Sequence, residues 1–381
     1  MQTRTLDLTT LAEKKSLFLF GPRSTGKSTL LRAQFPAGSI INLLKSSTFL
    51  PLAADPSRLA DVTREIAKSS RIIVIDEVQK IPALLDEVHD LIETAGLRFV
   101  LSGSSARKLK RGGVNLLAGR AWETRLFPFT SAELPGIELE RYLLYGGLPQ
   151  VWNSADPIEE LDAYVNTYLK EEVKEEALVQ NFVHFANFFR TTALASSEQV
   201  NFANISRDSG VNANTVKAWF SILEDTFLGF SLPAWRGSRK RKAVATAKFY
   251  LFDVGVANFL RGTRSLDGGG TAFGTAFEHF IAMELRAWIS YHRVKEEFSY
   301  WRSEGGVEVD FLVGTRLAIE VKSTRRASDK HLGGLRALKE EGLPFTLLLV
   351  SLDPLDRETT DGIRLLNWRT FLEKLWGGAF E

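Results

Sequence analysis

The chain has 381 residues, a hydrophobic fraction of 44%, a charged fraction of 25% and a formal net charge of +2. This length exceeds one typical core, so two to three domains are expected, and the composition is that of an ordinary globular protein. The small net charge excludes a strongly basic chain, so any surface that binds nucleic acid must be local. The chain has no cysteine, which excludes disulfides and the usual zinc-ribbon sites.

The amino-terminal residues carry no signal-peptide core, since Met1–Thr5 leads into Leu6-Asp7-Leu8. No apolar run approaches the roughly 20 residues that span a bilayer. We therefore expect a cytoplasmic protein without a membrane partner.

The stretch Leu17–Thr29 contains a phosphate-binding motif. Gly21, Gly26, Lys27 and Ser28 fit the template G-x-x-x-x-G-K-[ST], with a predicted strand at 16–20 before it and a predicted helix at 28–33 after it. Backbone N–H groups and the helix N-terminus would bind phosphates, Lys27 would reach the outer phosphates, and Ser28 would hold Mg²⁺. The alternative is a glycine-rich turn without a ligand. The predicted ATP-binding residues are Gly21, Pro22, Arg23, Ser24, Thr25, Gly26, Lys27, Ser28 and Thr29.

Residues 71–77 form an apolar run that ends in two adjacent carboxylates, Asp76 and Glu77. Consecutive branched residues predict a strand buried on both faces, as in a parallel sheet between helices. Asp76 should support Mg²⁺, and Glu77 should polarise the attacking water. Such a run is weak evidence alone, but downstream of a phosphate-binding loop it is a strong indication.

A further predicted strand, 97–101, ends in Ser102-Gly103-Ser104-Ser105. A polar group there could sense the γ-phosphate of ATP, and a simple turn that caps the next helix is an equally good interpretation. Of the arginines that follow, Arg107, Arg111 and Arg120, one could act as an arginine finger in a neighbouring subunit. We prefer Arg120 because Gly119-Arg120 opens the next predicted strand, although each arginine is alternatively a surface residue.

This order of motifs resembles the AAA-type ATPases, specifically the prokaryotic group whose ATPase domain is fused to an uncharacterised C-terminal domain. The resemblance rests on the phosphate-binding loop, Val74–Lys80, Leu101–Ser105, Leu117–Arg120 and Tyr145–Pro149. It implies an ATPase core over residues 1–135 that binds and hydrolyses ATP. It also implies ring-like or partner-dependent assembly, so we expect a homo-oligomer.

Residues 136–180 are expected to form the small helical lid that follows such a core. Helical spacing is shown by Leu139, Tyr142, Leu143, Leu161, Tyr164, Val165, Tyr168 and Leu169, with a Gly-Gly-Leu-Pro break between them. The dense charge of 170–176 is most simply a solvated helix face.

Residues 181–262 have the pattern of a winged helix-turn-helix. The pattern begins with a short helix at 205–210, a turn and a second helix from 214. Two strands follow, at 227–232 and 248–252. The connecting segment holds Arg236, Arg239, Lys240, Arg241 and Lys242. These cations suit phosphate contacts, and a solvated loop is an equal alternative. We expect a nucleic-acid partner, with DNA preferred, although this module also binds proteins.

Residues 271–381 are expected to form a last α/β domain, with Glu278 on its first helix. Strands at 307–313 and 317–322 form a predicted hairpin around a three-residue loop. Alternation places Val307, Val309, Phe311 and Val313 with Leu317, Ile319 and Val321 on one face, and Glu308, Asp310, Glu320 and Lys322 on the other. Asp310 then lies opposite Glu320, which predicts a divalent cation between two repelling carboxylates, or a raised carboxyl pKa.

Here the chain resembles the PD-(D/E)xK nuclease superfamily, through Asp310, Glu320-Val321-Lys322 and the upstream Glu278. The resemblance implies that Asp310, Glu320 and Glu278 bind Mg²⁺, and that Glu320 and Lys322 are catalytic, with Lys322 positioning or activating water. The chain departs from the pattern because Val309, and not proline, precedes Asp310. The five histidines show no paired metal-ligand spacing, and we interpret them as structural or exposed.

Two functions remain open at this point. The first is an ATP-hydrolysing AAA-type protein that acts on nucleic acid through a Mg²⁺-dependent, nuclease-like terminal domain. The second is a nucleotide-driven switch or scaffold whose terminal domain binds a protein partner without cleavage.

Overall fold

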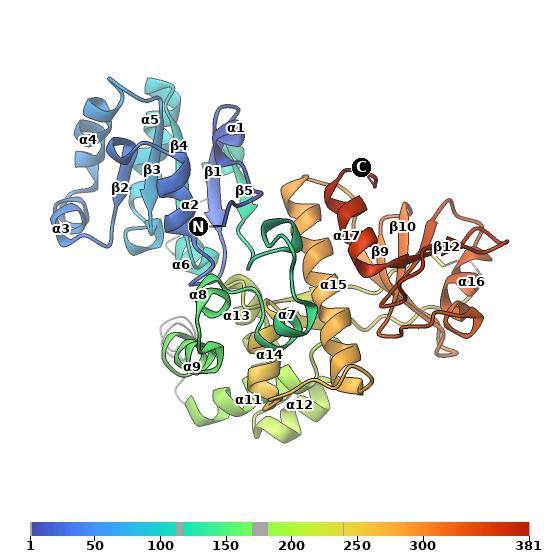
Figure 1. The fold of residues 1–381 in the computed structure, drawn as a ribbon. Helices are drawn as coiled ribbons and strands as arrows, with labels where there is room; N and C mark the ends of the chain where they lie inside the picture. Colours follow the sequence, from blue (N-terminus) through green and yellow to red (C-terminus); the bar gives the residue numbers. More distant parts are fainter. Residues whose placement is uncertain (1, 112–116, 170–181, 239, 381) are drawn as a thin grey trace. The chain divides into compact units, whose positions relative to one another are not determined.

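The computed structural model describes residues 2–111, 117–169, 182–238 and 240–380. These residues divide into two compact units (Figure 1). The first unit holds residues 2–129 and 220–228, and the second holds the remaining described residues. Among the described helices, none combines the length and the apolar composition that crossing a bilayer needs.

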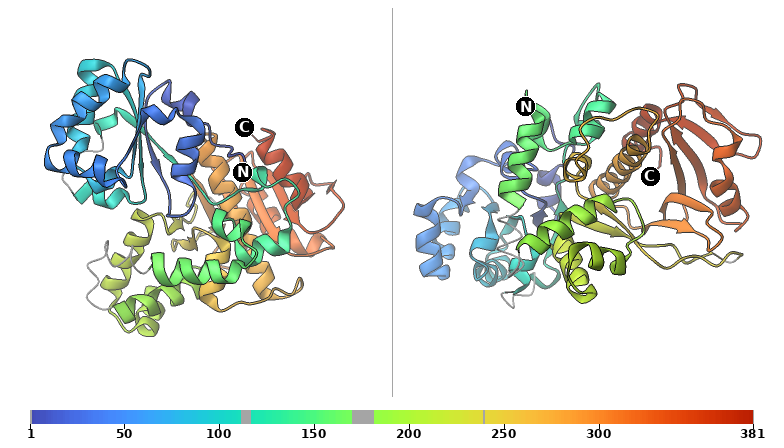
Figure 2. Two further views of the ribbon diagram at one scale, coloured as in Figure 1. Left: turned by 60° about the vertical axis from the view of Figure 1, so that its left-hand side comes forward. Right: turned by 90° about the horizontal axis from the view of Figure 1, so that it is seen from below.

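The first unit is built on a five-stranded parallel sheet with the strand order β2-β3-β4-β1-β5. Its strands are β1 (Ser16–Phe20), β2 (Ile40–Asn42), β3 (Ile72–Asp76), β4 (Arg98–Gly103) and β5 (Ala121–Arg125). All five residues of β1 are buried. Such burial is typical of a strand whose sheet is covered on both faces, and helices lie on both sides of this sheet in Figure 2.

The helices of the first unit pack against its sheet, and several of them share one hydrophobic core with one face of the sheet. The helices are α1 (Leu8–Ala12), α2 (Lys27–Gln34), α3 (Ser46–Ala54), α4 (Leu59–Ile66), α5 (Leu84–Ala95) and α6 (Ala106–Arg111). Phe227, far along the chain, belongs to the same core. Its ring stacks on Phe20 with the ring centroids 5.3 Å apart. The core of the first unit therefore includes a residue that lies outside the range 1–135 predicted for the ATPase core.

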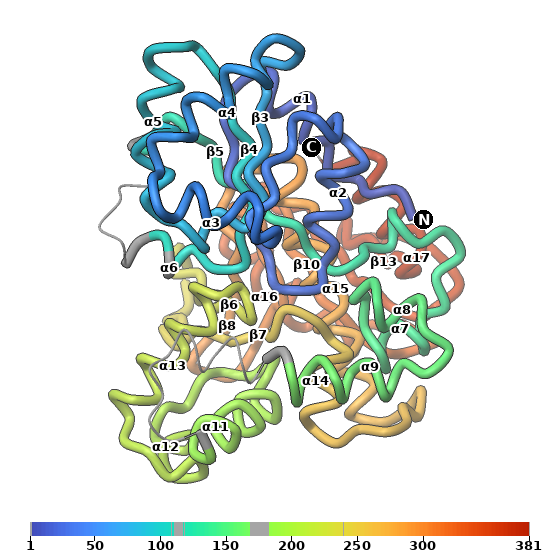
Figure 3. Tube along the Cα trace, turned by 90° about the vertical axis from the view of Figure 1, so that its left-hand side faces the viewer, coloured from blue at the N-terminus to red at the C-terminus, as the bar shows by residue number. Residues whose placement is uncertain are grey.

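The second unit begins with a helical region. Its helices are α7 (Leu139–Tyr145), α8 (Pro149–Asn153), α9 (Pro157–Ala163), a π-helical turn (Tyr164–Leu169), α11 (Phe182–Leu194), α12 (Phe202–Ser209), α13 (Ala213–Asp225) and α14 (Val254–Arg261). Residues 213–219 of α13 belong to this unit, and its later residues to the first. Figure 3 shows α11 and α12 side by side. The predicted lid is helical as far as 169, and the charged run 170–176 lies outside the described residues.

The Gly-Gly-Leu-Pro motif, residues 146–149, connects α7 to α8 and packs against the start of α14. A Cβ on Gly146 would lie 2.0 Å from Oδ1 of Asp253, and a Cβ on Gly255 would lie 2.0 Å from the carbonyl of Tyr145. Asp253 accepts hydrogen bonds from the backbone N–H of Gly147 at 2.9 Å and of Val256 at 3.0 Å. The glycines therefore allow two helices to pack backbone against backbone.

Strands β6 (Gly229–Leu232) and β7 (Lys248–Leu251) pair antiparallel, as the winged helix-turn-helix prediction requires. The segment between them instead follows the terminal sheet, since Trp235 N–H donates to the carbonyl of Tyr300 and Val244 N–H to that of Arg302. The guanidinium of Arg241 lies 2.6 Å from Glu340. The predicted wing tip is wrong for Arg241, because a carboxylate of the same unit already neutralises it.

The other cations of this segment differ from one another. Lys242 lies 2.7 Å from Glu304, but both side chains are largely exposed, so this ion pair adds little stability. The backbone N–H of Lys240 donates to Glu341. Arg239 lies outside the described residues.

A six-stranded mixed sheet with the order β12-β13-β11-β10-β9-β8 forms the terminal part. Its strands are β8 (Phe298–Arg302), β9 (Glu308–Val313), β10 (Leu317–Lys322), β11 (Thr346–Ser351), β12 (Arg357–Glu358) and β13 (Arg364–Asn367). Its helices are α15 (Thr271–Tyr291), α16 (Gly333–Lys339) and α17 (Trp368–Trp376). Helices α15 and α17 lie on one side of the sheet and α16 lies on the other (Figure 1). Along the chain, the elements from α15 to β11 follow the order α-β-β-β-α-β.

The predicted register of the β9–β10 hairpin is confirmed, because Leu317 pairs with Val313 and Ile319 with Phe311. The assignment of Val307 to the apolar face is wrong, because Val307 precedes β9 and its side chain is 36% exposed. Helices cover both faces of the sheet, so alternation does not separate a buried face from a solvated one here.

Candidate functional site

The phosphate-binding loop curls sharply between β1 and α2. Gly21, Ser24 and Gly26 all have positive φ, at 152°, 63° and 93°. A Cβ on Gly21 would lie 2.5 Å from the carbonyl oxygen of Leu126, so only glycine fits there. The Lys27 ammonium donates to the carbonyls of Gly21 at 2.7 Å and Pro22 at 2.8 Å. To hold a phosphate, it must exchange these carbonyl oxygens for phosphate oxygens.

Arg4 fastens this loop to the segment that follows β5. Its guanidinium donates to the carbonyl of Thr25 at 3.3 Å and to that of Phe127, and it lies 4.8 Å from the ring centroid of Phe129. Sequence reasoning missed Arg4, because a lone arginine ahead of the first helix belongs to no motif.

Asp76 and Glu77 are held by the end of β4, which lies between β1 and β3 in the sheet. The hydroxyl of Ser102 donates to Oδ1 of Asp76 and accepts from the backbone N–H of Glu77 at 3.1 Å. Carboxyl ends of parallel strands meet at one edge of a sheet, so these groups share an edge with the phosphate-binding loop. Ser102 therefore orients the carboxylate of Asp76, predicted to act on magnesium, and fixes the backbone of Glu77, predicted to act on water.

Gln79 holds the side chain of Glu77. Its Nε2 donates to Oε2 of Glu77 at 2.5 Å and to the hydroxyl of Ser104 at 3.4 Å. A Cβ on Gly103 would lie 2.9 Å from Oε1 of Gln79, so a larger residue at position 103 would clash with this amide. Gln79 lies in the motif 74–80, but nothing in the motif itself predicts a role for this amide.

Arg120 lies at the opposite edge of the sheet. It directly precedes β5, whose first residue, Ala121, pairs with Ser16 at the start of β1. The phosphate-binding loop follows the last residue of that strand. Arg120 forms an ion pair with Glu93 and is 34% exposed. The structure does not bring it to the loop of its own chain, and its role in a neighbouring subunit stays a prediction.

The terminal domain brings Asp310, Glu320 and Lys322 together, as the sequence predicts. Both carboxylates are buried, at 6% and 7% exposure. Nζ of Lys322 lies 2.5 Å from Oε1 of Glu320 and 3.8 Å from Oδ2 of Asp310. The backbone N–H of Val321 donates to that same Oδ2 at 2.8 Å. A lysine thus supplies the positive charge that two neighbouring carboxylates need.

Protonation within this cluster is shifted by burial and charge. Burial, and next the charge of Asp310, raises the pKa of Glu320 to about 8. Burial alone would lower the pKa of the Lys322 ammonium. The negative charges of Asp310 and Glu320 outweigh burial, so the pKa of Lys322 is raised. Lys322 therefore stays protonated and fits a role in positioning, not in accepting a proton. Oε2 of Glu320 is buried and has no hydrogen-bond partner among the described residues.

Glu278 lies beside this cluster but is bound by two other residues. It accepts from the hydroxyl of Tyr250 at 2.7 Å and from Nζ of Lys248 at 3.2 Å. Lys248 is 5% exposed and also lies 2.6 Å from Glu308. Burial raises the pKa of Glu278, and the charge of Lys248 works against that shift. Sequence reasoning missed Lys248, because a lysine that opens a strand has no distinguishing pattern.

The predicted magnesium ligands Glu278, Asp310 and Glu320 are not gathered as a ready metal site. Across the described residues, no group of three or more His, Cys, Asp or Glu side chains is placed to hold a metal ion. Carboxylate oxygens are nevertheless the ligands that Mg²⁺ prefers, and the unpartnered oxygen of Glu320 fits that chemistry. Asp310 and Glu320 could hold Mg²⁺ if Lys322 moved aside.

His279 follows Glu278 and is fully buried. Its Nε2 lies 2.7 Å from the carbonyl oxygen of Leu251, and burial lowers the pKa of the imidazole to about 3. A neutral, hydrogen-bonded histidine agrees with the structural role that we expected.

Three parts of the chain match known family models. Residues 13–134 match an AAA domain, residues 137–267 match a Domain of unknown function (DUF8612), and residues 273–371 match a Domain of unknown function (DUF4143). The chain thus carries an AAA-type ATPase domain in its N-terminal part and a DUF4143 domain in its C-terminal part.

Uncharacterized proteins of Mycobacterium bovis and Mycobacterium tuberculosis are each 25% identical to this chain over 323 residues, which is 82% of this chain and 71% of theirs. Among solved structures, a STAND signal-transduction ATPase with a tetratricopeptide-repeat sensor from Pyrococcus horikoshii is 14% identical with a TM-score of 0.21. The match covers 77% of this chain and 49% of that one, so the chain spans about half of its length. A score this low carries no argument about the fold.

Proposed function

We propose that this protein is an ATP-hydrolysing AAA-type protein that acts on nucleic acid, preferably DNA, and cleaves it with its terminal domain in a Mg²⁺-dependent reaction. The observation that carries the proposal is the pair of buried carboxylates, Asp310 and Glu320, with the half-buried ammonium of Lys322 beside them, on adjacent strands of an α-β-β-β-α-β unit. Burying charged groups is costly, and such clusters are characteristic of functional sites.

In the first unit, the phosphate-binding loop and Lys27 bind the phosphates of ATP, and Glu77 orients the attacking water. Water attacks the γ-phosphorus, the bond to the oxygen that bridges the β- and γ-phosphates breaks, and the water proton passes to Glu77. Ser28 and Asp76 would hold Mg²⁺, which neutralises the phosphate charge when it is bound. The products are ADP and inorganic phosphate.

In the terminal domain, water attacks the phosphorus of a phosphodiester, and the bond to one sugar oxygen breaks. Lys322, kept protonated by its neighbours, donates to the negatively charged phosphate oxygens. The proton of the attacking water passes to solvent through Glu320, and the leaving oxygen takes a proton from solvent. Asp310 and Glu320 would hold Mg²⁺, which supplies Lewis-acid polarisation of the phosphate when it is bound.

The decisive experiment incubates the full chain with labelled single- and double-stranded DNA and RNA, with Mg²⁺ or Mn²⁺, with and without ATP. We expect metal-dependent cleavage that Lys322→Ala abolishes and that Lys330→Ala, a change of an exposed lysine in the same domain, preserves. Lys27→Ala should separately abolish ATP hydrolysis. Cleavage that Lys322→Ala leaves unchanged would come from a contaminant and would refute the proposal.

The second candidate function is a nucleotide-driven switch or scaffold that cleaves nothing. It is favoured by the two lysines, Lys248 and Lys322, which already neutralise the carboxylates of the cluster. This candidate predicts intact ATP hydrolysis, no cleavage of any nucleic acid with either metal, and a protease digestion pattern of the terminal domain that differs between the ATP and ADP states.

A further inference from the structure

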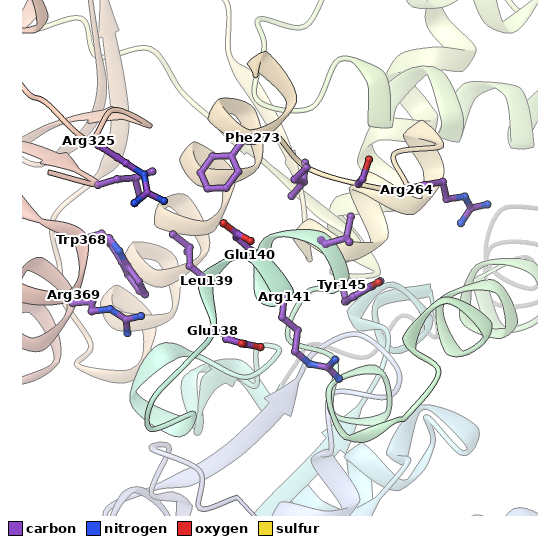
Figure 4. A pocket seen from close by; sticks show the side chains of 14 residues that line it. Glu138, Leu139, Glu140, Arg141, Tyr145, Arg264, Phe273, Arg325, Trp368 and Arg369 are labelled. Atoms are coloured by element: carbon purple, nitrogen blue, oxygen red, sulfur yellow. The ribbon is translucent and has the colours of Figure 1, made fainter. Parts of the chain in front are cut away.

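The second unit contains a cavity of about 670 Å³ that is separate from both sites described above (Figure 4). It is lined by α7, by residues 264–266 after α14, by the first turn of α15, by Arg325 after β10, by Leu352 after β11 and by the start of α17. None of its lining residues belongs to the Asp310 cluster. Ligand sites in proteins have volumes of about 300–1,000 Å³, so the cavity can hold a nucleotide-sized group.

Guanidinium groups dominate the charge of this cavity. Arg141, Arg264, Arg325 and Arg369 line it, against the two acidic residues Glu138 and Glu140. Within the described part of the chain, none of the four arginines forms an ion pair with a carboxylate. Four guanidinium groups against two carboxylates leave the lining with a net positive charge, which favours an anionic ligand.

Three of the guanidiniums are held in place by neutral groups, and one of them, Arg264, lies 5.0 Å from the ring centroid of Phe259. Arg141 donates to the backbone carbonyl of Trp152 at 3.1 Å. Arg369 lies over the ring of Trp368, with 4.2 Å between the guanidinium carbon and the ring centroid. Figure 4 shows Arg325 and Arg369 on one side of the cavity and Arg264 on the other. The positive charge is therefore spread around the cavity wall and is partly pre-oriented.

The remaining wall is aromatic and aliphatic. Phe273 and Trp368 line the cavity and are themselves 2% and 5% exposed, so they form part of a rigid wall. Leu139, Leu144, Leu266 and Leu352 extend this apolar surface. A ligand with phosphate groups and flat apolar rings matches both halves of the wall, and single-stranded nucleic acid has this combination. In a duplex, by contrast, the bases are stacked inside and are not offered to a pocket.

The cavity lies close to the Asp310 cluster along two elements. Arg325 follows Lys322 by three residues, which span at most about 10 Å of chain. Phe273 precedes Glu278 by five residues of α15, or about 7.5 Å of helix. Between them, a Cβ on Gly274 would lie 3.2 Å from the hydroxyl of Ser323, so the two elements are in contact.

We propose that this cavity binds a single-stranded segment of nucleic acid adjacent to the Asp310 cluster, with Arg325 and Arg369 contacting its phosphates. The inference rests on the proposed action on nucleic acid and names the part of the chain that holds the substrate. Both arginines are exposed, so their replacement leaves the core intact, whereas replacing the buried Trp368 would not.

The test measures binding of labelled single-stranded oligonucleotides to the full chain by fluorescence anisotropy over a range of salt concentrations. We expect Arg325→Ala/Arg369→Ala to weaken binding about tenfold for each arginine, and to reduce the slope of log K against log salt by about 1.4. The matched control is Arg326→Ala/Arg364→Ala, which removes two exposed arginines of the same domain that do not line the cavity. Thermal unfolding of both variants checks that they fold.

The outcomes separate this inference from the proposed function. If the wild-type chain binds nucleic acid and the Arg325/Arg369 variant binds it equally well, the assignment of the cavity as the binding site is wrong and the proposed function stands. If the control variant loses as much affinity as the Arg325/Arg369 variant, the loss reflects the net charge of the chain, and the assignment of the cavity is again wrong. If duplex is bound more tightly than single strands, with the same dependence on Arg325 and Arg369, the single-strand assignment is wrong. If the wild-type chain binds no nucleic acid, both proposals fail.

Discussion

Gln79 has a catalytic consequence that its position in the chain does not reveal. Its amide links the carboxylate of Glu77 to Ser104 at the end of β4. We expect Gln79→Ala to free the side chain of Glu77 and to lower kcat for ATP hydrolysis by about tenfold or more, with little change in nucleotide affinity. Steady-state kinetics and nucleotide titration measure the two effects separately.

A matched control for this prediction is Gln150→Ala, which removes an exposed glutamine of the other unit. Its kcat should equal that of the wild-type chain. A Gln79→Ala chain with unchanged kcat and weakened nucleotide binding would show that the amide supports the nucleotide and not the carboxylate of Glu77, which we propose orients the water.

Glu284 should make stability depend on pH. It accepts hydrogen bonds from Ser131 N–H at 2.8 Å, from the Ser131 hydroxyl at 2.7 Å and from Trp376 Nε1 at 2.7 Å. Burial nevertheless raises its pKa from 4.5 to about 7. The folded state therefore favours the protonated form, and its contribution to stability is complete below pH 4.5 and is lost as the pH rises through 7. The expected loss is about 3 kcal/mol.

The check is the free energy of unfolding, measured by denaturant titration between pH 4.5 and pH 7.5. Glu284→Gln should have a flatter profile over this range than the wild-type chain, with part of the slope remaining. Burial raises the pKa of Asp253 to about 6, so this second acid has the same sign. Equal slopes in variant and wild type would contradict the prediction.

At the scale of elements, the packing of α14 on α7 depends on Gly255. A Cβ there would lie 2.0 Å from both the carbonyl carbon and the carbonyl oxygen of Tyr145. We expect Gly255→Ala to force the helices apart and to destabilise the second unit by about 3 kcal/mol, which thermal unfolding measures. Gly268→Ala is the control, because no atom lies within 4 Å of its Cβ position. Equal melting temperatures of the two variants would show that the helices can adjust at no cost.

Several elements could be predicted from the sequence because their signals are local. Strands β1 and β10 have the predicted bounds, since β1 is an apolar run that ends before a glycine-rich turn, and β10 begins after a tight turn with alternating side chains. The hairpin register followed from alternation and a three-residue loop. The same local reasoning placed Asp310, Glu320 and Lys322 together.

The remaining features depend on contacts between distant parts of the chain. Lys248 reaches Glu278 only because β7 packs against α15, and no periodic pattern reports that packing. The ion pair of Arg241 with Glu340 could not be predicted, because the two residues are far apart in the sequence; phosphate contacts and a solvated loop were the alternatives for Arg241. Arg4 clamps a loop through backbone carbonyls, which every residue type offers equally.

At the scale of the whole molecule, the first unit is not a contiguous segment. Phe227 completes its core, where it is 6% exposed and stacks on Phe20. We expect Phe227→Ala to destabilise the first unit by about 3–5 kcal/mol and to lower the temperature at which ATP hydrolysis is lost. Leu50→Ala, which truncates a side chain that is 63% exposed, should leave that temperature unchanged. A full-length Phe227→Ala chain that keeps the wild-type temperature would contradict this view of the core.

The position of Arg120 at the edge of the sheet opposite its own phosphate-binding loop constrains any assembly in which it contributes to hydrolysis. A chain can then offer this arginine only to another chain, so Arg120 of one chain must meet the phosphate-binding loop of the next. Such contacts can be reciprocal in a two-fold dimer, close into a ring or continue as a filament. The turnover of each chain would then rise with protein concentration, and the dilute chain would be nearly inactive however well it folds.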